Sequence, residues 1–193
     1  MCSRYGYYEK ALDETEALAA IIEKGVYDVP FGEIGPVDNG VILRGENDSI
    51  KADVARFGWL GSDDRTLLIN ARSETIEEKP TFSEGFERHR CVIPVNEYFE
   101  WNLHKEKASF ASSKGDILFL AGICDVRGNM LQFTVLTRDA DEVMKPVHDR
   151  MPVLVSRDAI GEWIFDQKSA EQIMGAPQEE LVRNIEYEQL SFI

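Results

Sequence analysis

A series of short runs rich in β-branched and aromatic residues begins at Val41, and it constrains the fold more than any other feature of the sequence. The runs are separated by Gly, Asp and Asn, as strands are: VILR, VARFGW, LLINARS, RCVIPVNEYFEW, DILFLAGICDV, MLQFTVLT and MPVLV. Arg127-Gly128-Asn129 between two of them predicts a tight hairpin, so that pair should be antiparallel. The pattern predicts a strand-rich α+β domain with helices at its periphery.

Three helices are expected around these strands. DETEALAAIIEK, residues 13–24, has an Asp-x-x-Glu capping box, four apolar residues on one face and Gly25 as a stop. Ser156 can cap a helix over RDAIGEWIF, and SAEQIMGA forms another that ends at Gly175. The stretch 25–40 is rich in Gly and Pro and should be a loop.

Composition sets the class of the protein. At 193 residues and 44% hydrophobic content, residues 1–193 should form one domain. The net charge of −14 argues against nonspecific adhesion to polyanions, although a local basic groove stays open. Three cysteines without CxxC spacing favour a reduced compartment, the cytoplasm or the nucleoid. We expect no signal peptide and no membrane partner, because neither pattern is present.

Cys2 directly follows the initiator methionine, so removal of Met1 makes it the N-terminal residue. A free N-terminal cysteine is a 1,2-aminothiol, with an amine pKa near ~7.7–8 and a thiol pKa near ~8.5. Both groups are therefore partly nucleophilic at neutral pH. Cys91 and Cys124 lie in apolar runs and are expected in the core.

Polar residues inside or beside the apolar runs are candidates for chemistry, because burying them without a partner is unfavourable. Asn70 and Arg72 alternate in LLINARS, and Glu100 stands between two aromatic residues that should raise its carboxyl pKa. His148 and Arg150 precede the last run. Taken singly, each also fits a turn cap, a salt bridge or a structural histidine. His89 and His104 should face solvent.

MCSRY, LINARSET, RCVIPVNEYFEW and VHDRMPVLV, in this order and spacing, resemble the SRAP family, the SOS response-associated peptidase domain. The resemblance runs from Cys2 to about Trp163. It implies a twisted, mostly antiparallel, barrel-like core with peripheral helices. It further implies a protein that senses abasic sites in single-stranded DNA and bonds to them covalently. We expect a monomer, since a covalent single-strand binder has no need of symmetry, and no cofactor or metal.

The same resemblance assigns roles to individual residues. Cys2 is the nucleophile, which closes a thiazolidine ring on the opened sugar, and Asn70 holds the N-terminus and that sugar. Glu100 positions the amine and moves its proton, while His148 acts as acid and base on the sugar hydroxyl. The DNA-binding residues are Arg4, Trp59, Arg72 and Arg150. A second activity implied by the family name is autocatalytic cleavage of the Met1–Cys2 bond.

This chain departs from the family at several points that bear on DNA binding. It reads MCSR where members usually read MCGR, and Glu33 stands where a loop Asn is usual. After Trp59, whose family counterparts stack on bases, it has Ser62, Asp63 and Asp64. We expect these changes to affect DNA affinity rather than the chemistry.

Three alternatives remain open from the sequence. The first is a noncatalytic reader of modified or damaged DNA that uses the same groove. The second is an N-terminal-nucleophile amidase or peptidase, for which Asn70 is the visible side-chain candidate for an oxyanion hole. The weakest is a zinc site from Cys2, Cys91 and His148, because no pair has ligand spacing.

Overall fold

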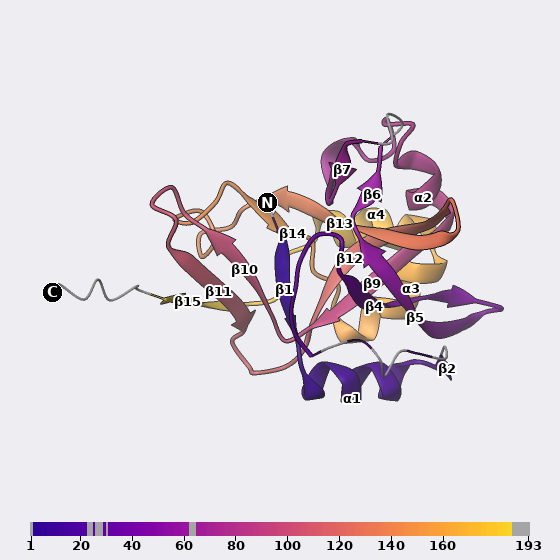
Figure 1. Ribbon diagram of the computed structural model, residues 1–193, viewed down its shortest axis with the longest axis horizontal. Coiled ribbons are helices and arrows are strands. Elements are labelled where there is room, and N and C mark those ends of the chain that lie inside the picture. Colours follow the sequence, from indigo (N-terminus) through magenta and orange to yellow (C-terminus); the bar gives the residue numbers. More distant parts are fainter. Residues whose placement is uncertain (1, 23–24, 26–28, 30, 62–64, 187–193) are drawn as a thin grey trace, which may run out of the picture.

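The computed structural model describes residues 2–22, 25, 29, 31–61 and 65–186, and a closed barrel dominates it (Figure 1). Neighbouring strands pair antiparallel from β5 to β4, then to β9, β12 and β13. β13 returns to β5 in parallel, so the ring closes. Its strands are β4 (Asn39–Glu46), β5 (Ser49–Phe57), β9 (Arg90–Val95), β12 (Leu118–Arg127) and β13 (Met130–Asp139). The expected antiparallel hairpin at 127–129 and the barrel-like core are confirmed.

Short strands pair with the C-terminal end of β13, beyond the part that forms the barrel. β8 (Asn70–Arg72) and β14 (Arg150–Pro152) both pair with β13, and Thr137 faces Arg72 of one and Pro152 of the other. They therefore lie on opposite edges of β13. β2 (Ile21–Ile22) pairs with β5, and β6 (Trp59–Leu60) pairs with β7 (Leu67–Leu68).

A second, fully antiparallel sheet stands beside the barrel, at the left of Figure 1. Its order is β15 (Leu181–Glu186), β11 (Lys107–Ser112), β10 (Glu97–Trp101), β1 (Arg4–Tyr7) and β3 (Gly32–Ile34). β9 of the barrel continues into β10 through Asn96, whose side chain accepts a hydrogen bond from the Tyr8 amide at 2.8 Å. The run RCVIPVNEYFEW is thus two strands in two sheets, which carries the chain from one to the other.

The helices lie outside both sheets: α1 (Glu9–Leu18), η2 (Ser73–Thr75), α2 (Ser83–Arg88), η3 (Arg157–Ala159), α3 (Ile160–Phe165) and α4 (Gln167–Gly175). Asp166 caps α4 by accepting from the Ser169 amide, and Gly175 ends it as expected. Ser156 stands at the start of η3 but makes no side-chain capping bond. Within the described residues, no helix is long and apolar enough to cross a membrane.

Two expectations about the first forty residues were wrong. The first helix begins at Glu9 and ends at Leu18, so Asp13 lies inside it instead of capping it. Ile21 and Ile22 form β2 instead of a further helical turn, and β2 pairs in parallel with β5. The stretch 25–40 contains β3, which pairs with β1; residues 26–28 and 30 lie outside the described residues.

Candidate functional site

Cys2 lies just before β1, at the junction of the two sheets, and is fully buried. Asn70 in β8 holds it in place, because its side-chain amide donates to the Cys2 carbonyl at 2.9 Å. The second amide hydrogen is used on the Ile69 carbonyl at 2.8 Å. The buried Asn70 Oδ1 has no hydrogen-bond partner among the described residues. The two amide hydrogens of Asn70 are therefore used by backbone carbonyls, and Oδ1 is the acceptor that remains.

Glu100 approaches Cys2 from β10. Arg4 faces Phe99 in the β1–β10 register, which brings Cys2 to the end of β10 where Glu100 lies. Only 3% of Glu100 is exposed, and this burial raises the pKa of its carboxyl, although the positive form of His148 opposes the rise. Burial, and then the charge of Glu100, raise the pKa of the Cys2 thiol well above its ordinary value. The expected desolvation of Glu100 is confirmed.

A structured turn delivers His148 to the same place. Asp141 accepts from the amides of Val143 and Met144 at 3.0 and 2.9 Å, and the His148 amide donates to the Met144 carbonyl at 3.1 Å. Met144 packs on β10, with its sulfur 4.0 Å from the Tyr98 hydroxyl. His148 therefore faces β10 because its own turn is fixed to that strand.

The ring of His148 is oriented by the backbone that follows it. Two groups contact Nδ1: the Arg150 amide at 2.9 Å, which requires a nitrogen without a proton, and Asp149 Oδ1 at 2.8 Å, which requires Nδ1–H. The two contacts therefore belong to alternative proton positions of the ring. Both direct Nδ1 toward the residues that follow His148, so the local backbone orients the ring.

A cleft of about 500 Å³ opens beside His148. It runs between the end of β10 and the turn before β14, and its lining includes Trp101, His104, Lys145 and His148. Its charged lining is mixed, because Lys145 is exposed and ion-paired with Glu142, while the Asp149 carboxylate belongs to the same lining. The cleft therefore carries both signs of charge beside His148.

The three candidate phosphate-binding arginines differ in availability. Arg72 is exposed, and Arg4 is 40% exposed with Glu33 at 3.6 Å. Arg150 is buried, and carboxylates of Glu74 and Asp139 already bind its guanidinium at 2.6–2.8 Å. Its placement does not favour the expected contact with phosphate, because a phosphate must displace these partners.

Trp59 is also buried, with 1% of its surface exposed. The Arg127 guanidinium stacks over its ring at 4.1 Å and Phe82 packs edge-on at 5.9 Å. Arg127 covers one face of the ring and almost none of the Trp59 surface is accessible, so the placement of Trp59 does not favour the expected role in base stacking. Ser62, Asp63 and Asp64, the departures that follow it, lie outside the described residues.

Cys91 and Cys124 are buried in the barrel strands, and His89 and His104 are exposed, as expected. Within the described part of the chain, no three His, Cys, Asp or Glu side chains are grouped to hold a metal ion. Sequence reasoning missed Glu74, which follows Asn70 in the motif LINARSET and pairs with Arg150. Its place inside that motif, four residues after Asn70, is the signal that could have found it.

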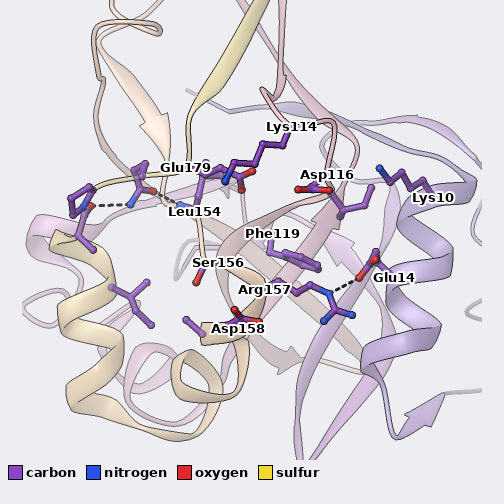
Figure 2. Close-up of a pocket in the computed structure, with 16 residues that line it drawn as sticks. Lys10, Glu14, Lys114, Asp116, Phe119, Leu154, Ser156, Arg157, Asp158 and Glu179 are labelled. Carbon is purple, nitrogen blue, oxygen red and sulfur yellow. Dashed lines mark hydrogen bonds and ion pairs between the residues drawn. The ribbon is translucent and has the colours of Figure 1, made fainter.

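A cavity of about 560 Å³, somewhat larger than the cleft beside His148, lies between α1 and the segment 154–159 (Figure 2). Phe119 and Leu154 contribute apolar lining, and Arg157 Nε donates to Glu14 at 2.9 Å (Figure 2). None of the predicted site residues lines it. Size alone therefore does not identify the reactive site of this molecule.

Comparison with known proteins finds a matching family model, similar protein sequences and similar solved structures. The family model described as SOS response associated peptidase (SRAP) matches residues 1–192. The abasic site processing protein YoaM of Bacillus subtilis is 28% identical over 85% of this chain and 79% of its own length. YedK of Escherichia coli, named likewise, is 27% identical over 89% of this chain and 83% of its own. A crystal structure from Bordetella bronchiseptica superposes with a TM-score of 0.81 at 22% identity, covering 96% of this chain and 100% of that one.

Proposed function

The chain belongs to the SOS response associated peptidase (SRAP) family, and we propose that it captures abasic sites in single-stranded DNA through a covalent bond to Cys2. Relatives that match most of its length are named abasic site processing proteins. The observation that carries the proposal is the joining of Cys2 to Asn70 by a hydrogen bond, with Glu100 close enough to raise the pKa of the thiol. Once Met1 is removed, the buried Cys2 carries an amine and a thiol beside a desolvated carboxyl, an arrangement suited to proton transfer during bond formation.

The chemistry proceeds in two bond-forming steps once Met1 has been removed. The α-amine of Cys2 attacks C1′ of the open-chain aldehyde, and loss of water gives an imine. The thiol then adds to the imine carbon, and its proton ends on the nitrogen, which closes a five-membered thiazolidine. Proximity makes the second step effectively unimolecular. The product is protein without Met1 plus DNA minus one water.

The side chains around Cys2 divide the remaining work. Asn70 fixes the carbonyl of Cys2, and its unpartnered Oδ1 accepts a proton donor of the substrate or of the new N-terminus. Glu100 takes and returns protons of the amine and thiol. His148 gives a proton to the ring oxygen O4′ as the C1′–O4′ bond breaks and that oxygen becomes the C4′ hydroxyl, and it takes the proton back during reversal. Arg72 and Arg4 contact flanking phosphates.

Removal of Met1 is a precondition, and we propose that the same site can perform it. The Met1–Cys2 bond is directly attached to the atoms that Asn70 and Glu100 surround. Intact-mass analysis after expression tests this: Glu100→Gln should retain Met1 to a larger extent than the wild type. Equal processing of both proteins assigns the cleavage to a cellular aminopeptidase.

The central experiment mixes purified protein with a single-stranded oligonucleotide that carries one abasic site, followed by denaturing gel and intact-mass analysis. Cys2→Ala removes the nucleophile, and Cys124→Ala is the matched control because that thiol is buried in the barrel. We expect a denaturation-resistant species from the wild type and the control, and none from Cys2→Ala. If Cys2→Ala binds the oligonucleotide like the wild type and neither forms the species, the protein is a noncatalytic reader.

A further inference from the structure

The second sheet turns one face toward the barrel and the other face outward. Tyr5 and Tyr98 lie opposite each other in β1 and β10 and are fully buried, and the Tyr5 ring contacts an aromatic ring of the barrel strand β5. Because side chains alternate along a strand, Arg4 and the residue opposite it, Phe99, belong to the outer face. Lys107 of β11 joins them there, with Nζ 4.0 Å from the centre of the Phe99 ring. Two cations thus reach the outer face from the strands on either side of β10.

Glu33 holds both cations with one carboxylate. It lies in β3 opposite Gly6, so its side chain reaches the same outer face across the edge of β1. Lys107 Nζ donates to Glu33 Oε1, and Arg4 Nη1 lies 3.6 Å from Glu33 Oε2. The side chain of Glu33 is 35% exposed and that of Arg4 is 40% exposed. The carboxylate is therefore bound at a surface that a competing anion can reach.

These two cations lie at the end of the sheet that is nearest to the candidate site. Arg4 begins β1 and is two residues from Cys2 in the chain. Lys107 begins β11 opposite Trp101, the last residue of β10, and Trp101 lines the cleft beside His148. A single strand that presents a sugar to Cys2 therefore has a flanking phosphate within reach of Arg4 and Lys107.

Resting on the proposed function, we propose that Arg4 and Lys107 bind one phosphate of the single strand together, and that the Glu33 carboxylate occupies this position in the free protein. Entry of the strand exchanges the carboxylate for the phosphate. Two phosphate oxygens replace Oε1 and Oε2, so both cations keep an anionic partner while Glu33 turns to solvent. Glu33 thereby lowers the affinity for single-stranded DNA and takes no part in the covalent chemistry. Lys107 becomes a DNA contact besides the arginines.

The test measures equilibrium binding of an undamaged single-stranded oligonucleotide, in a Cys2→Ala background in which no thiazolidine can form. Glu33→Gln keeps the shape of the side chain and removes its charge, so Arg4 and Lys107 have no carboxylate to release. We expect the Kd at low salt to fall roughly threefold to tenfold, because two partly exposed ion pairs no longer have to be broken. In protein that retains Cys2, the crosslinking rate constant at saturating abasic DNA should stay unchanged.

Glu97→Gln is the matched control for the loss of one negative charge. Glu33 and Glu97 both lie opposite Gly6, one from each strand beside β1, and therefore share the outer face. Glu97 does not pair with Arg4 or Lys107, so its replacement should leave the Kd nearly unchanged. Thermal unfolding of each variant confirms that it is folded at the assay temperature.

A double variant tests the contribution of Lys107. In the Glu33→Gln background, Lys107→Gln should cancel most of the gain in affinity. It should also reduce the slope of log Kd against log salt by about 0.7, the value for one phosphate contact on a single strand. In the presence of Glu33 the same change should have a smaller effect, because it removes both a phosphate contact and an ion pair that binding has to break.

Each outcome decides one part of the proposal. Equal tightening by Glu33→Gln and Glu97→Gln assigns the effect to net charge and overturns the exchange. An unchanged or raised Kd for Glu33→Gln overturns it as well and leaves the three side chains as an ion-pair network within the sheet. A gain that Lys107→Gln does not reduce overturns the role of Lys107. A wild-type protein with a free Cys2 N-terminus that forms no crosslink refutes the proposed function, while the Kd comparison, which needs no covalent step, still decides the role of Glu33.

Discussion

Replacing Asn70 by Ala removes the amide group that holds Cys2, and the structure allows the effect to be estimated. The variant loses the hydrogen bond to the Cys2 carbonyl at 2.9 Å and the one to Ile69 at 2.8 Å. A hydrogen bond of this kind contributes about 0.5–1.5 kcal/mol net. Because about 1.4 kcal/mol is a factor of ten, loss of the first bond should lower the fraction of correctly placed Cys2, and the crosslinking rate, roughly two- to tenfold.

Asn70→Asp has nearly the same shape and should be worse than alanine at neutral pH. It brings a carboxylate, which can only accept, against two carbonyl oxygens that need donors. Burial and these carbonyls raise the pKa of the introduced carboxyl, and its protonated form can donate to one of them. The rate of Asn70→Asp relative to the wild type should therefore rise as the pH falls.

Single-turnover crosslinking to an abasic oligonucleotide at saturating DNA, measured for the three proteins over a pH series, tests this reasoning. Rates are compared as ratios to the wild type at each pH, since protonation of the Cys2 amine slows all three alike. Equal rates for the three proteins, or an Asn70→Asp ratio that does not change with pH, would show that Asn70 does not hold Cys2 for reaction.

Three further outcomes are expected. Glu100→Gln should slow crosslinking but stabilise the fold at neutral pH. Burial raises the pKa of Glu100 in the folded protein, so the free energy of unfolding of the wild type falls as the pH rises from the unfolded-state pKa through the folded-state pKa. Urea unfolding between about pH 4 and 8 should show this decline in the wild type and not in Glu100→Gln. Arg90→Met should lower the free energy of unfolding, measured in urea, by about 3–5 kcal/mol. The reason is that the buried Arg90 guanidinium donates to four backbone carbonyls in the last turns of α2 and α3. A decrease in the free energy of unfolding below about 1 kcal/mol contradicts this. Arg72→Ala should reduce the salt dependence of single-strand binding by a slope of about 0.7, whereas the exposed Arg88→Ala should leave it unchanged.

The strands were predictable because each has the alternation or apolar run that its environment requires, but the closure of the barrel was not. The parallel pairing of β13 with β5 joins residues 132–133 to residues 56–57, and no local pattern encodes so distant a contact. The first helix was misplaced for a related reason. Ile21 and Ile22 continue a helical apolar stripe in the sequence, and only the presence of β5 beside them makes them a strand.

The candidate site was predictable to the extent that its residues stand beside strands that converge. Asn70, Glu100 and Cys2 do so, and the turn at 141–147 brings His148 to them. The partners of Arg150 were not predictable, because an arginine before a strand looks the same in sequence whether it binds phosphate or a carboxylate. Its main partner, Glu74, is 76 residues away.

In the proposed capture reaction, the burial of Cys2 bears on which of its two nucleophiles we expect to react first. Thiolate is the reactive form of cysteine, and burial and Glu100 raise the pKa of this thiol, so it is protonated at neutral pH. An α-amine has an ordinary pKa near ~7.7–8, so we expect the Cys2 amine to attack the aldehyde first. We expect the thiol to follow, with its proton passing to the imine nitrogen, so that the acid–base groups end as they began. It follows that Cys2→Ser should stop at the imine, because a hydroxyl is a far weaker trap. Its complex should survive denaturation only after reduction with borohydride, whereas the wild-type complex should survive without it. A Cys2→Ser crosslink that is stable without reductant would place the thiol outside the reaction.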